Sequence, residues 1–538
     1  MIQVLGLKKA FSDKTLFENV NLKFTEGNTY GIIGANGAGK STFLKILSGE
    51  VEATSGNIVV EKNKRISVLN QNHAMYDEFN VTEVVIMGNT DLYKIKEQKD
   101  AIYANPDATI EDYTLAGELE DKYGELGGWT AENDAQKLLS DLSIPEEKWN
   151  LTLKELTANE KIKVLLAKAL FGNPDILIMD EPTNHLDLKS IKWLENFLIE
   201  YPHVVIVVSH DSDFLDAICT HTVDIDYNQA TIYTGNYSFW KQSSELAREL
   251  QKQSNLKKEA QMEKLKEFIA RFSANASKSK QATSRKKSLE KIVLDEIKPS
   301  NRKYPFIRWE MHRDHGKQIL NVENLSYKNE AGVYLFKDVT FTLMPGEKMV
   351  VLSNDDIAKT KLLEIISGVT KPTEGTVTWG QTIKHTYFPN ENSNYFKGDE
   401  TILEWISKWP LENSTEETKD ASDARMRSFL GRMLFSSDSV FKKVNVTSGG
   451  EKARLMFSRM MLLESNFLIF DQPLDHLDTE SIDSVIEGIQ AYKGGVVFTT
   501  YNRAFVNKCA NVIFEMKPNF ESFIFRGSLQ DYEETMGY

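Results

Sequence analysis

The fold of this chain is decided by the stretch Gly34-Ala35-Asn36-Gly37-Ala38-Gly39-Lys40-Ser41. The stretch follows an apolar, strand-like run and precedes a helical pattern, which is the context that a phosphate-binding loop requires. Its glycines let backbone N–H groups turn inward around phosphates, its lysine can reach the β- and γ-phosphates, and its serine can bind Mg²⁺. The N-terminus of the following helix adds partial positive charge. The stretch therefore predicts a binding site for a nucleoside triphosphate.

A second apolar run, residues 176–179, leads into two carboxylates, Asp180 and Glu181. Asp180 suits a Mg²⁺ ligand, and Glu181 suits the base that orients an attacking water. An acidic pair on the surface is the alternative interpretation. His210 follows the next apolar run, residues 204–208, where it can contact a γ-phosphate, although a histidine at a strand end is often structural.

The chain also repeats its own pattern. Residues 31–49 align with residues 350–368 at an offset of 319, and residues 178–182 align with residues 469–473 at an offset of 291. Because the offsets differ by 28, the first copy carries about 28 additional residues. We place this insertion, which has a helix-friendly composition, within about residues 90–135.

Three parts follow from this repeat. We predict a first unit over residues 1–240, a linker over residues 241–317 and a second unit over residues 318–538. Each unit is α/β, because apolar β-rich runs alternate with helical periods. In the linker, apolar residues recur at near-helical spacing on both sides of a Ser-, Ala- and Lys-rich break at residues 273–284. That pattern predicts two helices joined as a hairpin.

Composition and charge restrict the function. A length of 538 residues suits two to four domains. No apolar run reaches the ~18–20 residues that span a bilayer, and no secretory pattern is visible at the N-terminus. The two cysteines, Cys219 and Cys509, form neither a disulfide framework nor a metal-ligand motif. We therefore expect a cytoplasmic protein with no membrane partner, and the net charge of −14 argues against a general nucleic-acid coat.

Five motifs in order give nearly the whole chain a specific resemblance to ATP-binding cassette (ABC) ATPases. The resemblance implies two P-loop cassettes that sandwich ATP head to tail, so that each nucleotide meets the Walker motifs of one cassette and the signature of the other. The motifs are residues 34–42 (Walker A), Gln71 (Q-loop), residues 180–187 (Walker B and D-loop), residues 209–211 (H-loop) and residues 448–452 (signature).

For the first site, this resemblance implies a complete set of residues for ATP and Mg²⁺. The base is Glu181, assisted by His210 and Gln71, and the Mg²⁺ ligands are Ser41, Gln71 and Asp180. Phe11 resembles the aromatic residue that stacks on adenine, although a core phenylalanine is the alternative. The residues expected to bind ATP are Phe11, Gly34, Asn36, Gly37, Gly39, Lys40, Ser41 and Thr42, with Ser448, Gly449 and Gly450 from the second cassette.

The second site departs from the family pattern. Its loop replaces the three glycines with Ser353, Asp356 and Ala358, so side chains obstruct the loop and aspartates repel a triphosphate. An amide in place of the base costs roughly 10²–10⁴ in rate. We predict that this degenerate site never hydrolyses ATP and binds nucleotide weakly or not at all. Its family positions are held by Lys359, Thr360, Asp471, Gln472 and Tyr501, facing the altered signature Thr157-Ala158-Asn159-Glu160.

The linker carries a local positive charge. Residues 271–291 hold seven basic residues and one acidic residue, and such a segment can pair with RNA phosphates. A solvated helix end is the alternative interpretation. Residues 271–285 resemble the interdomain linker of the ABC-F family, and within that family the chain is most similar to the bacterial YbiT-type branch. The candidate RNA-binding residues are Arg271, Lys278, Lys280, Arg285, Lys286 and Lys287.

The resemblance to ABC-F proteins implies a function. A monomer with paired cassettes would bind the ribosomal exit site when ATP is bound, with its linker toward P-site tRNA and large-subunit rRNA and its insertion serving as an arm that contacts the stalk region. ATP hydrolysis at one competent site would release it, and the cycle would regulate translation. The alternatives are an ATP-binding subunit of an ABC transporter and a ribosome-protecting antibiotic-resistance factor, although the short linker tip weighs against the latter.

Overall fold

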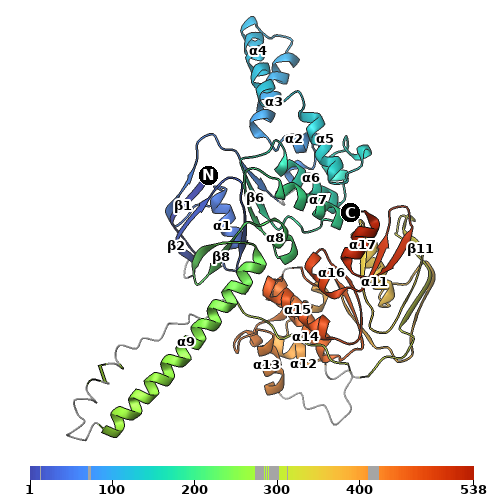
Figure 1. Ribbon diagram of the computed structural model, residues 1–538. Coiled ribbons are helices and arrows are strands. Elements are labelled where there is room, and N and C mark those ends of the chain that lie inside the picture. The colour runs from blue at the N-terminus through green and yellow to red at the C-terminus, as the bar shows by residue number, and fades with distance from the viewer. Residues whose placement is uncertain are drawn as a thin grey trace.

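The computed structural model contains the two α/β units that the repeat predicts (Figure 1). Helices α3 and α4 project from one end of the molecule, and helix α9 projects in a different direction, away from α3 and α4. Among the residues it describes, no helix combines the length and the apolar character needed to cross a membrane. These residues are 1–11, 14–70, 74–272, 284, 286, 287, 289, 302–311, 313–409, 423–475 and 477–537.

The first cassette is built on a six-stranded sheet in the order β5-β6-β7-β3-β8-β9. Five strands are parallel, and β9 runs antiparallel to β8. Every residue of β3 and β7 is buried, because both faces of the sheet are covered and such strands become continuous apolar runs. The carboxyl ends of the parallel strands meet at one edge, where ligands bind in such sheets. The strands are β5 (Ile66–Leu69), β6 (Ile176–Asp180), β7 (Val204–Val208), β3 (Thr29–Ile33), β8 (His221–Asp226) and β9 (Gln229–Thr234).

An antiparallel sheet and a set of helices complete this cassette. The sheet has the order β2-β1-β4, with β2 (Lys14–Phe24), β1 (Ile2–Phe11) and β4 (Ser55–Val60). The helices are α1 (Lys40–Leu47), α2 (Val81–Ile86), α3 (Thr90–Ala104), α4 (Ile110–Glu125), α5 (Ala131–Asp141), α6 (Ala158–Leu170), α7 (Leu188–Ile199) and α8 (Ser212–Ile218).

Helices α3 and α4 project from the first cassette as a pair (Figure 1). Asn89 caps the start of α3, and Thr109 forms a capping box with Asp112 at the start of α4, so a polar side chain defines where each helix begins. Both helices lie within the range where the two repeat offsets place the insertion.

The second cassette repeats this architecture. Its six-stranded sheet has the order β14-β15-β16-β12-β17-β18, and its antiparallel sheet has the order β11-β10-β13. The strands are β14 (His385–Phe388), β15 (Phe467–Asp471), β16 (Gly495–Thr499), β12 (Lys348–Ser353), β17 (Val512–Met516), β18 (Ser522–Arg526), β11 (Tyr334–Leu343), β10 (Leu320–Lys328) and β13 (Glu374–Trp379). The helices are α11 (Asp356–Ile366), α12 (Ile402–Ser407), α13 (Asp423–Arg432), α14 (Gly449–Leu462), α15 (Thr479–Ala491), α16 (Arg503–Cys509) and α17 (Leu529–Met536).

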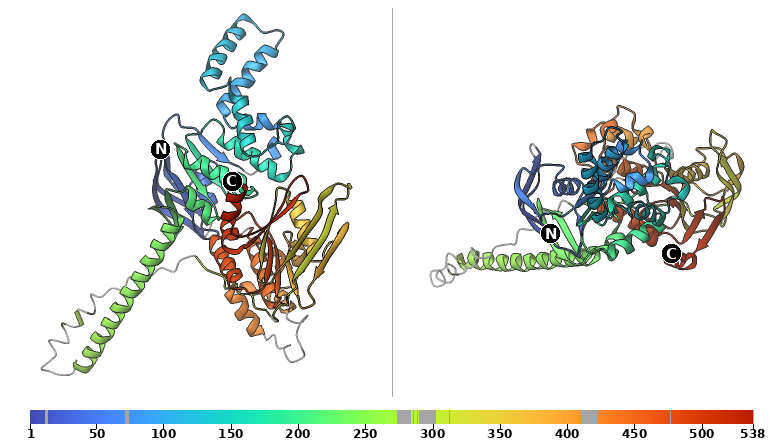
Figure 2. Two further views of the ribbon diagram at one scale, coloured as in Figure 1. Left: turned by 45° about the vertical axis from the view of Figure 1, so that its right-hand side comes forward. Right: turned by 90° about the horizontal axis from the view of Figure 1, so that it is seen from above.

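The first half of the linker is one helix, α9 (Tyr237–Phe272), which extends away from both cassettes in every view (Figures 1 and 2). The second half lies largely outside the described residues, so the hairpin stays a prediction. Where the chain returns, Ile307 and Trp309 pack into the core of the second cassette.

Arg302 fixes the root of the linker to both cassettes. Its side chain is 3% exposed and pairs with Asp224 of β8 at 2.7 Å and with Glu480 of α15 at 2.6 Å. Its guanidinium also lies 4.4 Å from the ring centre of Trp240 in α9. Because a buried charge requires such pairing, the linker root, β8 and α15 are held as one joint.

Candidate functional site

The phosphate-binding loop of site one lies between β3 and α1, as predicted. Gly37 and Gly39 adopt φ values of 74° and 102°, a region that favours glycine, and a Cβ on Gly39 would lie 3.0 Å from the Leu16 side chain. Lys40 is 8% exposed, and its Nζ donates to the Gly34 carbonyl at 2.7 Å. Burial lowers the pKa of Lys40, with the Glu181 carboxyl opposing that shift. The Lys40 ammonium is thus bonded to carbonyl oxygens of the loop, and phosphate oxygens can replace these as its acceptors.

Glu181 follows β6 in an unusual backbone conformation. Its φ is 51°, and its N–H donates to the Val208 carbonyl at 2.9 Å, which holds the left-handed turn in place. Oε2 accepts from the His210 N–H at 3.2 Å, whereas Oε1, 3.5 Å from His210 Nε2, accepts no hydrogen bond from the described residues. Burial, reinforced by the neighbouring Asp180, raises the pKa of Glu181 to about 8. One buried oxygen of the Glu181 carboxyl is thus left to accept a hydrogen bond from a water molecule.

His210 links Glu181 to the second cassette. Burial, with the Lys40 ammonium adding to it, lowers the pKa of His210 to about 3, so its ring is neutral. Its Nδ1 lies 3.0 Å from Thr479 Oγ1, and its carbonyl accepts from Asn502 Nδ2 at 3.3 Å. A cavity of about 220 Å³ between the cassettes is lined by Glu181 and His210 on one side and by Tyr501 and Asn502 on the other.

Sequence reasoning missed Thr479 and Asn502. A signal for Thr479 exists, because it directly follows residues 475–478, the second copy of the 184–187 motif. Asn502 follows Tyr501 in the same way that Asp211 follows His210.

The predicted Mg²⁺ ligands come from neighbouring elements. Ser41 lies in the first turn of α1, Asp180 ends β6, and α1 packs against β6. Within the described parts of the chain, no group of three or more His, Cys, Asp or Glu side chains is placed to hold a metal. A hydroxyl and one carboxylate fit Mg²⁺, which is held by few protein ligands together with substrate phosphates. Gln71, the third predicted ligand, lies outside the described residues.

The remaining predicted ATP contacts lie on two cassettes. Phe11, at the end of β1, is 52% exposed, so it is no core residue and its ring is available for stacking. Lys9 Nζ lies 4.8 Å from the centre of that ring. Ser448 caps α14 through a capping box with Glu451, and Ser448 and Gly449 are exposed. The signature therefore presents the N-terminus of a helix, as phosphate recognition requires.

The loop of site two has a different shape. Helix α11 begins at Asp356, three residues before Lys359, whereas α1 begins at Lys40, the lysine that aligns with Lys359. In site two, helix therefore replaces the glycine turn of site one. The Asp355 side chain accepts from Ile357 N at 2.9 Å and from Ala358 N at 3.2 Å. Backbone N–H groups that would face phosphate are therefore already bonded to a carboxylate.

The other positions of site two also have protein partners. Asp471 Oδ1 accepts from Thr499 Oγ1 at 2.7 Å, and a side-chain hydrogen bond from Thr360 reaches the same carboxylate. Gln472 keeps the left-handed conformation of Glu181, with φ 48°, and its N–H donates to Thr499 Oγ1 at 3.0 Å. Tyr501 lies in the loop between β16 and α16, and Lys359 Nζ is 4.6 Å from its ring centre.

The predicted RNA-binding residues are only partly described. Arg271 lies in the last turn of α9, and Lys286 and Lys287 are exposed. Lys278, Lys280 and Arg285 lie outside the described residues. The end of α9, in whose last turn Arg271 lies, is far from both cassettes (Figure 2).

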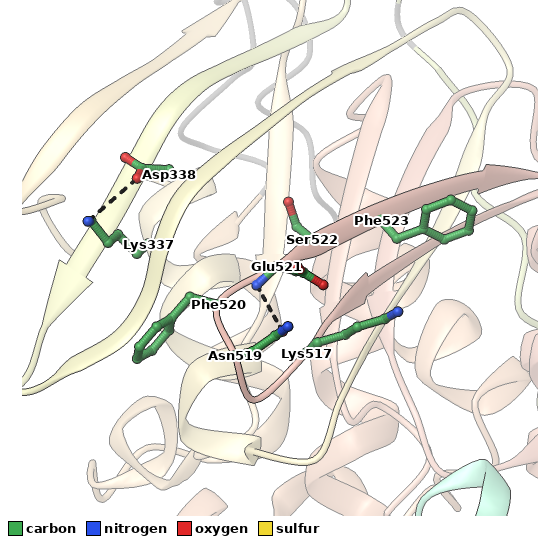
Figure 3. A pocket seen from close by; sticks show the side chains of 8 residues that line it. All are labelled: Lys337, Asp338, Lys517, Asn519, Phe520, Glu521, Ser522 and Phe523. Carbon is green, nitrogen blue, oxygen red and sulfur yellow. Dashed lines mark hydrogen bonds and ion pairs between the residues drawn. The ribbon is translucent and has the colours of Figure 1, made fainter.

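A further hollow lies on the second cassette, with a volume of about 610 Å³ (Figure 3). Lys337 and Asp338 of β11 face the turn between β17 and β18, where Phe520 lies. Its lining includes no residue of either nucleotide site, and we assign no function to it.

Comparison with known proteins agrees with this geometry. A family model described as ABC transporter matches residues 17–184 and 336–475, and a second model with the same description matches residues 223–309. Over 520 residues the chain is 50% identical to the uncharacterized ABC transporter ATP-binding protein YkpA of Bacillus subtilis (strain 168), covering 96% of this chain and 95% of that one.

Two further relatives and one solved structure are similar over nearly the whole chain. The probable ATP-binding protein YbiT of Escherichia coli O157:H7 is 42% identical, with 98% of each chain covered. ABC transporter F family member 5 of Arabidopsis thaliana is 30% identical over 100% of this chain and 77% of its own. The complex of archaeal ribosomal stalk protein aP1 with archaeal ribosome recycling factor aABCE1 superposes with a TM-score of 0.59 at 16% identity, covering 99% and 92% of the two chains, and shows the same fold.

Proposed function

This chain belongs to the ABC-F family of ATP-binding cassette ATPases, and from that premise we propose that it is a ribosome-binding factor that hydrolyses ATP at site one alone and regulates translation. The observation that carries the proposal is α9, a helix of 36 residues that leaves the cassettes and leads into the basic segment 271–291. Segments of this charge bind RNA phosphates by releasing counterions.

Site one supports a mechanism for hydrolysis. The glycine turn and Lys40 bind the β- and γ-phosphates, and the exposed signature of the second cassette closes onto the γ-phosphate. Ser41 and Asp180 would hold Mg²⁺, which neutralises phosphate charge when bound. Glu181 orients the attacking water through Oε1. The backbone N–H of His210 donates to Oε2 of Glu181, and the His210 ring contacts the Thr479 hydroxyl. Closure of the cassettes and assembly of the catalytic groups are therefore coupled.

The raised pKa of Glu181 predicts a dependence of hydrolysis on pH. A base must be ionised to accept a proton, so with a pKa of about 8 the kcat/KM for ATP should rise about tenfold per pH unit between pH 6 and 8 and then level off. Steady-state ATPase measurements on the full chain would show this rise of kcat/KM with pH, and the residual activity of Glu181→Gln should not show it. A flat profile over that range would contradict the role of Glu181 as the base.

Ribosome binding should depend on ATP. We expect the Glu181→Gln variant, which binds ATP but hydrolyses it very slowly, to co-sediment with ribosomes when ATP is present and to be absent from the pellet without it. Wild-type protein should be retained less, because hydrolysis releases it. No association of either protein under both conditions would leave the ATPase assignment in place and remove the ribosome role.

Two other functions give different outcomes. An ATP-binding subunit of an ABC transporter would bind a membrane complex rather than ribosomes, and α9 has no purpose there. A ribosome-protecting antibiotic-resistance factor would share the ATP-dependent sedimentation. A drug-susceptibility test of an expressing strain separates that second function from a general role in translation.

A further inference from the structure

Asp356 stands where site one has Gly37, and its carboxylate occupies the centre of site two. Lys359 Nζ lies 2.5 Å from Asp356 Oδ1, and the Tyr501 hydroxyl donates to Oδ2. Lys359 and Tyr501 align with Lys40 and His210, the residues expected to meet the phosphate in site one. A carboxylate of this chain therefore has the partners that family geometry gives to a phosphate oxygen.

A third contact to Asp356 comes from the other cassette. Asn159 Nδ2, in the first turn of α6, donates to Asp356 Oδ2 at 2.5 Å. Asn159 occupies the signature position that glycine, Gly450, holds in the second cassette. A glycine brings its backbone near the γ-phosphate, whereas an asparagine side chain reaches across the interface to a carboxylate.

The surroundings of Asp356 favour its ionised form. Burial alone would raise the pKa of Asp356, but the Lys359 ammonium and the hydrogen bonds from Tyr501 and Asn159 hold it below the usual range. Asp355 meanwhile bonds the first N–H groups of α11. Asp356 thus pairs with the lysine, and Asp355 with the helix N-terminus, that a nucleotide phosphate would otherwise bind.

We propose that site two is a nucleotide-free junction in which the Asp356 carboxylate replaces a bound phosphate: it is held by Lys359 and Tyr501 of its own cassette and joins that cassette to the first through Asn159. This extends the proposal that only site one hydrolyses ATP and does not depend on ribosome binding. The cassettes stay joined at site two throughout the cycle, and ATP closes site one about that fixed edge.

Nucleotide stoichiometry gives the first test. With Mg²⁺ and radiolabelled ATP in equilibrium dialysis, the full-length Glu181→Gln variant should bind one ATP per chain, and adding Lys40→Ala should abolish that binding. Two equivalents per chain would overturn the junction, even if hydrolysis were still confined to site one. One equivalent combined with no ribosome association would remove the ribosome role and leave the junction standing.

Hydrogen exchange without nucleotide gives the second test, with a matched pair of variants. Asp356→Asn removes the charge that joins the cassettes, whereas Asp355→Asn removes an equal charge one residue away and keeps a good helix cap. We expect amides 157–161, in the opposite cassette, to exchange about 10- to 100-fold faster in Asp356→Asn than in wild type, the range expected for loss of charge-assisted hydrogen bonds. Asp355→Asn should exchange as wild type does.

Asn159→Ala removes the same bond from the other side and should speed exchange in residues 354–360. It serves as the second variant if Asp356→Asn fails to fold. Equal exchange in the Asp356 and Asp355 variants would overturn the proposal. The proposal would also be overturned if amides 157–161 of the wild-type protein became protected only when ATP is added.

Discussion

Glu181→Gln is expected to lower the ATPase rate by about 10²–10⁴-fold, because an amide can position a water molecule but accepts its proton poorly. The amide can keep the hydrogen bond from the His210 N–H, so the geometry of the site should survive the change. Steady-state phosphate release measures the effect, and ATP binding by equilibrium dialysis shows that the variant still takes up its substrate.

The reciprocal variant is the control for this expectation. Gln472→Glu restores a carboxylate at the same left-handed position of the second cassette. It should not raise the ATPase rate, since the loop of site two is helical and its Lys359 is already paired with Asp356. A gain in rate from Gln472→Glu, or an unchanged rate in Glu181→Gln, would show that hydrolysis is not confined to site one.

Lys40→Ala is expected to lower kcat/KM for ATP by about 10²–10³-fold, the loss typical of removing one preorganised group that stabilises transition-state charge. Its ammonium is held on loop carbonyls within reach of a bound phosphate, so its loss acts directly on ATP. The same ATPase measurement, with ATP concentration varied, separates weaker binding from slower turnover.

The aligned variant Lys359→Ala is the matched comparison. Lys359 is also buried, but its partner is Asp356, so its removal should disturb the interface and change ATP turnover far less. Equal losses in Lys40→Ala and Lys359→Ala would be incompatible with a single competent site.

The two cassettes and their ATP-binding loops could be predicted because local sequence determines them. The glycine turn requires glycine, and an apolar run ending in Asp180 and Glu181 places both carboxylates at a strand end. The loss of glycines from site two likewise followed from the sequence.

The rest depends on contacts between distant parts of the chain. The sequence presents Asp356 as a group that repels phosphate, and only the fold brings Asn159 of the other cassette to it. In the sequence, Arg302 cannot be told from the other basic residues of the linker, because its partners, Asp224 of β8 and Glu480 of α15, are distant in the chain. The left-handed backbone of Glu181 also depends on the neighbouring strand, since the Val208 carbonyl holds it.

The length of α9 has a mechanical consequence. A helix of 36 residues is about 54 Å long, so a rotation of about 5° at its base displaces its far end by about 5 Å. Its base is anchored by Arg302, whose other partner, Glu480, neighbours Thr479 beside His210. A small shift at the contact between Thr479 and His210, if it rotated this joint, would therefore become a larger displacement at the far end of α9.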